Sequence, residues 1–162
     1  MAALPCGLYR TTLPLTEREE QVPAGRLVYF HNHSSEGPPL VLLPRVNTDN
    51  RWTFHDRGYL VRDADWTVTL VALPSEGFYI LRGHFHPPGG PVVHERTLLQ
   101  LGYNLAGDPI LFIPKLEDNA IRFPSVGYRF ETLDILKDLD PAPFVLPRPV
   151  AAPEDDHGPL LH

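Results

Sequence analysis

Short apolar runs that alternate with polar residues, separated by turn-forming residues, recur along most of the chain. The clearest example extends from Trp66 to His86, where two arms rich in β-branched and aromatic residues flank Pro74-Ser75-Glu76-Gly77. Such arms on either side of a four-residue turn are typical of a β-hairpin, so the pattern predicts that residues 66–73 pair with 77–85. Both arms are apolar on both faces near the turn, and we therefore expect this hairpin in the middle of the structure.

Comparable runs predict further short strands, about eight to ten in all. We expect these other strands at 26–31, 40–43, 52–55, 59–61, 97–104, 110–113, 120–123 and 128–130. Turn signals at intervals of about eight to twelve residues are typical of a sandwich or barrel. The sequence therefore predicts a single all-β domain, either a β-sandwich or a closed β-barrel. Its predicted core comprises Val28, Phe30, Val41, Phe54, Leu70, Leu81, Leu101, Ile110, Phe112 and Phe123.

One segment near the C-terminal end, 132–139, favours a short helix. Leucines recur at every third position from Leu133 to Leu139, and Thr132 is a suitable N-cap residue. Pro141 disfavours helix at the residue before it and sets the predicted end. We expect this short helix to cover one end of the sandwich or barrel.

The residues after the predicted helix differ in composition, which divides the chain into a β-domain (1–140) and a C-terminal segment (141–162). Six of the last 22 residues are proline, a composition that favours extended conformations and builds no core of its own. The segment nevertheless carries three adjacent apolar residues, Phe144, Val145 and Leu146. Two interpretations stay open: a disordered Pro-rich tail, or an arm that places these side chains on a partner.

Composition narrows the classes of partner. A formal net charge of −6 argues against nucleic-acid binding, which usually requires a basic surface. No apolar run approaches the roughly 18 residues of a membrane span. The single cysteine, Cys6, rules out an internal disulfide and suits a reducing compartment, and no secretory signal precedes it. These features predict a cytoplasmic protein.

The histidines are the strongest candidates for chemistry. His84 and His86 share one face of a predicted strand, and His94 and Glu95 follow after a short loop. Imidazole and carboxylate ligands of this kind hold divalent ions such as zinc or iron. A His-x-His strand followed by a glutamate is similar to the metal motif of the cupin barrels, which implies a metal-dependent enzyme or small-ligand binder. Glu95 comes later than in that motif, so the cupin-like interpretation is the alternative one.

Other catalytic patterns are absent from the sequence, including a nucleophile elbow, a phosphate-binding glycine loop and a dinucleotide fingerprint. The favoured hypothesis is therefore a non-catalytic binding or assembly module without a cofactor. Such a module would contact a protein partner or copies of itself, as a homo-oligomer, through its loops and C-terminal arm.

Overall fold

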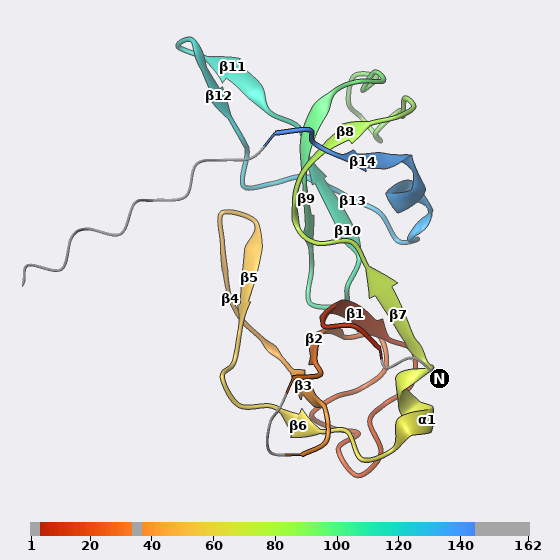
Figure 1. The fold of residues 1–162 in the computed structure, drawn as a ribbon. Helices are drawn as coiled ribbons and strands as arrows, with labels where there is room; N and C mark the ends of the chain where they lie inside the picture. Colours follow the sequence, from red (N-terminus) through yellow and green to blue (C-terminus); the bar gives the residue numbers. More distant parts are fainter. Residues whose placement is uncertain (1–3, 34–36, 145–162) are drawn as a thin grey trace, which may run out of the picture.

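The computed structural model describes residues 4–33 and 37–144, which form two five-stranded antiparallel sheets and two separate two-stranded hairpins (Figure 1). The all-β prediction is confirmed. The described strands do not close into a barrel, so the barrel alternative is wrong and the arrangement is sandwich-like. The chain passes from the first sheet to the second through one short linker, residues 74–76.

The N-terminal sheet has the strand order β6-β3-β2-β1-β7. Its strands are β1 (Gly7–Thr11), β2 (Leu27–His31), β3 (Leu40–Leu42), β6 (Tyr59–Leu60) and β7 (Leu70–Leu73). One face of this sheet buries a cluster that comprises Tyr9, Leu15, Val22, Val28, Phe30, Val41, Val61, Trp66 and Leu70. The four-residue helix α1 (Ala64–Thr67), which contributes Trp66 to this cluster, begins after Asp63, whose carboxylate accepts a hydrogen bond from the backbone of Asp65.

The C-terminal sheet has the strand order β13-β10-β9-β8-β14. Its strands are β8 (Gly77–Leu81), β9 (Leu98–Tyr103), β10 (Pro109–Phe112), β13 (Tyr128–Arg129) and β14 (Leu139–Pro141). The second buried cluster lies mainly on this sheet and includes Leu99, Leu101, Tyr103 and Leu111. It also includes Leu27 and Leu73 of the N-terminal sheet, so the two sheets share apolar packing where they meet.

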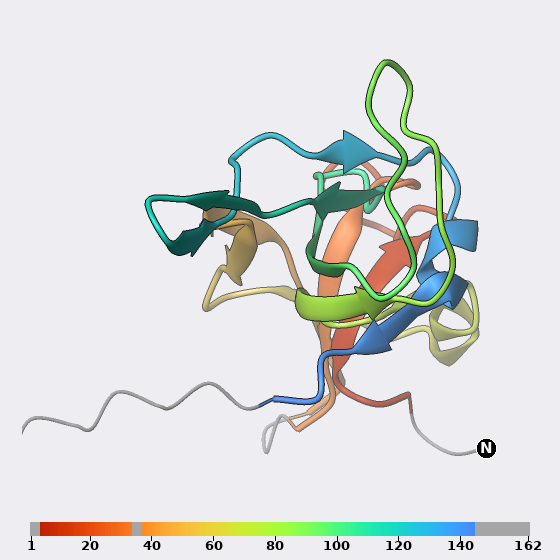
Figure 2. The same cartoon turned by 90° about the horizontal axis from the view of Figure 1, so that it is seen from above.

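The two hairpins project toward the same side of the molecule (Figures 1 and 2). They are β4 (Pro44–Thr48) with β5 (Arg51–Phe54), and β11 (Lys115–Glu117) with β12 (Ala120–Arg122). Each has a two-residue turn, at Asp49-Asn50 and at Asp118-Asn119, in which both residues have positive φ. That conformation suits tight hairpins, and Asp and Asn adopt it more readily than most residues.

The predicted pairing of 66–73 with 77–85 is wrong. β7 pairs only with β1, whereas β8 pairs with β9 and β14. The two arms therefore belong to different sheets, and Pro74-Ser75-Glu76 connects the sheets instead of turning a hairpin. β7 has apolar residues on both faces because Leu70 packs in the cluster of the N-terminal sheet and Leu73 packs in the cluster that the two sheets share. The first part of the predicted arm is α1 rather than strand.

The predicted helix at 132–139 is also corrected. The structure has a 3₁₀ helix, η1 (Asp134–Asp138), and Leu139 begins β14. The leucines at every third position, of which Leu133 and Leu136 are half-buried and Leu139 is buried, match the three residues per turn of a 3₁₀ helix, not the 3.6 of an α-helix. Residues 145–162 of the predicted Pro-rich arm lie outside the described residues.

Most of the predicted core is confirmed. Seven of its residues are buried, namely Val28, Phe30, Val41, Leu70, Leu81, Leu101 and Phe112. Phe54, Ile110 and Phe123 are only half-buried. Among the described residues, no helix has the length and apolar character needed to cross a membrane.

Candidate functional site

Buried polar contacts hold the linker between the two sheets. The hydroxyl of Tyr103 donates to the carbonyl oxygen of Pro74 at 2.8 Å, and the hydroxyl of Tyr79 donates to that of Ser75 at 2.6 Å. Burial raises the pKa of both tyrosines, so they remain neutral donors. Because both tyrosines belong to the C-terminal sheet, these bonds fix the linker against that sheet.

Glu76, the last linker residue, has the most strongly shifted pKa of the carboxyl groups among the described residues. Its Oε2 accepts a hydrogen bond from the backbone N–H of Trp52 at 2.9 Å, which connects β5 to the linker. Its Oε1 is buried without a hydrogen-bond partner in the described part of the chain. Burial raises the pKa of Glu76 to about 7, although the Trp52 N–H and the charge of Arg51 act in the opposite direction. Glu76 therefore changes charge near neutral pH.

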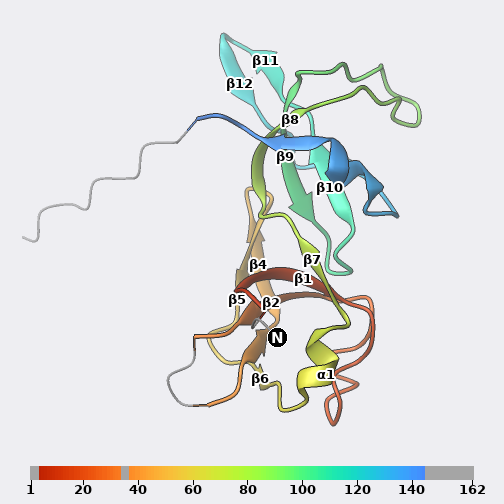
Figure 3. The ribbon, with the colours of Figure 1, turned by 45° about the vertical axis from the view of Figure 1, so that its right-hand side comes forward.

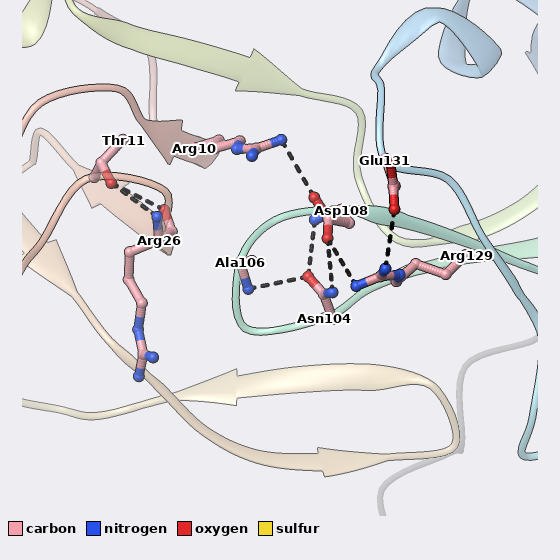
Figure 4. Close-up of polar contacts among 8 residues, drawn as sticks. All are labelled: Arg10, Thr11, Arg26, Asn104, Ala106, Asp108, Arg129 and Glu131. Atoms are coloured by element: carbon pink, nitrogen blue, oxygen red, sulfur yellow. Dashed lines mark hydrogen bonds and ion pairs between the residues drawn. The ribbon is translucent and has the colours of Figure 1, made fainter.

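A second polar cluster surrounds Asp108 in the turn between β9 and β10 (Figure 4). The carboxylate is largely buried and lies 3.3 Å from Nη1 of Arg10 in β1 and 3.6 Å from Nη1 of Arg129 in β13. Asn104 donates from Nδ2 to Asp108 at 3.0 Å, and its Oδ1 accepts two backbone N–H groups of the turn. Asp108 thus connects the two sheets electrostatically, which is a structural role.

Replacing Asp108 by alanine is expected to lower the free energy of unfolding by about 2 kcal/mol, since two cations and an amide lose their partner. The expected cost is below that of a fully buried pair because Arg10 and Arg129 are partly exposed. Urea titration followed by circular dichroism measures it. Glu131→Ala is the matched control, because that exposed carboxylate also pairs with Arg129 and its removal is expected to cost less than about 0.5 kcal/mol. Equal effects of the two substitutions would contradict the prediction.

The hairpin β11–β12 exposes apolar side chains on one face. Leu116 and Ile121 pair directly across the hairpin, so both side chains lie on the same face, and they are 74% and 62% exposed. The opposite face is polar and carries an ion pair between Arg122 and Glu117 at 3.9 Å. All six strand residues are exposed. The hairpin is therefore amphipathic, yet its apolar face is left open to solvent by the described residues.

The described residues that follow β14 run between the β4–β5 and β11–β12 hairpins (Figures 1 and 3). A groove lies there, against the tip of the β4–β5 hairpin. It has a volume of about 460 Å³ and is lined by Asp49, Arg51, Gly77, Phe78, Gln100, Ala142 and Phe144. The ring of Phe78 lies 5.9 Å from that of Phe144 and 5.1 Å from that of Phe123, which follows β12. Phe144 remains 45% exposed. We call the groove together with Leu116 and Ile121 the hairpin face.

Of the predicted partner-binding residues, Phe144 lies in the hairpin face, and Val145 and Leu146 lie outside the described residues. The signal for the rest of the face is weak in the sequence, because Leu116 is the lone apolar residue between Lys115 and Glu117. A single alternation of this kind is too short to identify a strand, and β11 was not among the predicted strands.

The predicted metal ligands lie in the long loop between β8 and β9. His84, His86, His94 and Glu95 are all exposed. The structure brings together the rings of His84 and His86, whose centroids are 6.0 Å apart. Within residues 4–33 and 37–144, no group of three or more His, Cys, Asp or Glu side chains is arranged to hold a metal ion.

Comparison with known proteins adds no assignment: no family model, no curated protein and no solved structure matches this chain. Its function must therefore be argued from its own residues.

Proposed function

We propose that this chain is a non-catalytic binding or assembly module that contacts a protein partner, or further copies of itself, through the hairpin face. The observation that carries this proposal is the exposed Leu116–Ile121 pair on an amphipathic hairpin. An isolated two-stranded hairpin is marginally stable in water, and it gains stability when its apolar face packs against another surface. Apolar patches rimmed by polar groups mark sites of protein association.

The C-terminal arm, 141–162, is the second part of the proposal. The arm begins at the groove, where Ala142 donates its backbone N–H to the backbone carbonyl oxygen of Phe78 at 3.0 Å and the ring of Phe144 packs near the ring of Phe78. Val145 and Leu146 would each contribute about 1.5–3 kcal/mol if fully buried on a neighbour, and Phe144, which is only 45% exposed, would contribute less. Proline lowers the conformational entropy that the arm loses on ordering.

The proposed partner is a protein, and neither nucleic acid nor a membrane. The net charge of −6 supports this because it opposes binding to phosphates and anionic lipids. A cytoplasmic location belongs to the same proposal, on the basis of the single cysteine.

The double substitution Leu116→Ser with Ile121→Ser tests the hairpin face. We expect the variant to fold with unchanged circular dichroism and to form a smaller assembly than the native chain at equal concentration, because the interface loses its apolar pair. Multi-angle light scattering measures the assembly, and pull-down with the native chain as bait measures partner capture. The matched control is Val68→Ser, which removes another exposed apolar side chain (69% exposed) and should change neither. Val68 is the C-cap residue of α1, and Figure 1 shows α1 at the opposite end of the molecule from β11 and β12.

Removal of residues 145–162 tests the arm while leaving β14 intact. If the arm reaches a neighbour, the truncated chain should form a smaller assembly; if the arm packs on its own domain, truncation should lower stability without changing the assembly. A native chain that is monomeric at high concentration and captures no partner would contradict the whole proposal.

A further inference from the structure

The segment that carries His84 and His86 has a fixed backbone. Phe85, between them, exchanges two backbone hydrogen bonds with Val93, at 3.0 and 2.9 Å. Its ring packs edge-on against Tyr128 at 6.2 Å and Phe130 at 5.5 Å, measured between ring centroids. Phe85 therefore anchors this extended segment to the C-terminal sheet at a point away from the regular strands.

Because side chains alternate along extended backbone, the inward direction of Phe85 places His84 and His86 together on the outward face. Both imidazoles are exposed, and their centroids lie 6.0 Å apart with an interplanar angle of 81°. A metal ion bound to nitrogens of both rings requires rings at about this separation, since each Zn–N or similar bond is about 2.0–2.1 Å long. Rotation of two exposed side chains is then the main adjustment that metal binding demands.

The cation that lies closest in sequence to His84, Arg82, does not oppose a metal ion strongly. Arg82 precedes His84 by two residues, but its guanidinium forms an ion pair with Asp140 and a second hydrogen bond to the same carboxylate at 3.3 Å. Because both side chains are exposed, solvent and salt screen the remaining charge of this pair. The site therefore faces solvent in a chain of negative net charge.

We propose that His84 and His86 form a two-histidine surface site for a divalent transition-metal ion, with water in the remaining coordination positions. Neutral imidazole favours Ni²⁺, Cu²⁺ and Zn²⁺, whereas Mg²⁺ and Ca²⁺ require oxygen ligands. This inference is independent of the proposed partner-binding function, because the two histidines are not part of the hairpin face.

The chain contains a second His-x-His pair that serves as an internal comparison. The rings of His31 and His33 lie 6.3 Å apart, close to the separation of the first pair. His31 differs in being half-buried at the end of β2, with Nδ1 at 4.0 Å from Sγ of Cys6. Its ring is therefore less free to turn toward an ion shared with His33.

Isothermal titration of the full chain with Ni²⁺ at pH 8, without an affinity tag, tests the site. We expect stoichiometric binding that is lost in His84→Ala and in His86→Ala. Binding should persist in His94→Ala, the neighbouring exposed histidine, and in the double variant His31→Ala with His33→Ala. Circular dichroism and thermal melts without metal should be unchanged in the His84, His86 and His94 variants, as expected for exposed positions.

Three results would overturn the inference: a native chain that binds no Ni²⁺, binding that survives both His84→Ala and His86→Ala, or binding that is lost only in the His31/His33 double variant. The last result would assign the ion to the other pair.

Discussion

Replacing Tyr103 by alanine is expected to lower the free energy of unfolding by about 4 kcal/mol, the range for removing a large buried aromatic side chain. Tyr103 is 2% exposed and lies in the cluster that both sheets share. Its backbone carbonyl also accepts the indole N–H of Trp52 at 2.7 Å, so the cavity would lie beside the contact that holds β5. Urea titration followed by tryptophan fluorescence and by circular dichroism measures the loss.

Tyr103→Phe separates the hydrogen bond from the packing. This variant keeps the ring but leaves the carbonyl of Pro74 without its donor, and we expect a cost of about 1–2 kcal/mol. Tyr128→Phe is the matched control, because within the described residues the hydroxyl of Tyr128 makes no hydrogen bond, and it should cost less than about 0.5 kcal/mol. If Tyr103→Phe costs no more than the control, the linker is not held by this bond.

The strands were largely predictable because alternation of apolar and polar residues records which face is buried. β2, β5, β9 and β10 all lie within predicted ranges or one residue beyond them. β1 was not recognised as a central strand. Its residues Tyr9 and Thr11 are both buried, but a buried threonine looks polar in the sequence, and here its hydroxyl donates to the carbonyl of Pro23 at 2.7 Å.

The pairing of strands was less predictable than their existence. A Pro-Ser-Glu-Gly sequence between two apolar arms is compatible with a hairpin turn. It is equally compatible with a linker that runs from one sheet to another. The difference lies in contacts distant in sequence, such as those of β7 with β1 and of β14 with β8. Local sequence patterns do not indicate which strands pair with each other.

The candidate site was predicted only in part. Phe144 was identified because it belongs to an apolar group among prolines, and it does line the groove. The half-buried position of Glu76 gave no local signal, because glutamate is common in exposed turns. It became visible only once the structure placed Trp52 of the β4–β5 hairpin against the linker. Buried polar groups of this kind depend on tertiary contacts and not on local pattern.

Glu76 should make the stability of the fold depend on pH in the range from about 4.5 to 7. Its folded-state pKa is raised from 4.5 to about 7, so the folded chain holds a proton that the unfolded chain has released. The contribution of the protonated carboxyl is fully present below pH 4.5, decreases as the pH rises to about 7, and changes little above that. The shift corresponds to at most about 3 kcal/mol, and partial solvent exposure of Glu76 reduces the expected loss to about 1–2 kcal/mol.

Glu76→Gln is therefore expected to raise the free energy of unfolding at pH 8 by about 1–2 kcal/mol relative to the native chain, and to change it little at pH 4.5. The amide oxygen of glutamine can still accept from the backbone N–H of Trp52, while the buried negative charge is removed. Urea titrations of both chains at pH 4.5, 6 and 8 measure the difference between their free energies of unfolding. The other acidic groups are the same in both chains, so their contribution to the pH dependence cancels in this difference. Glu95→Gln, at an exposed position, is the control and should change the free energy of unfolding by less than about 0.5 kcal/mol at every pH. A Glu76→Gln difference that is the same at pH 4.5 and pH 8 would show that this carboxyl does not titrate between them in the folded chain.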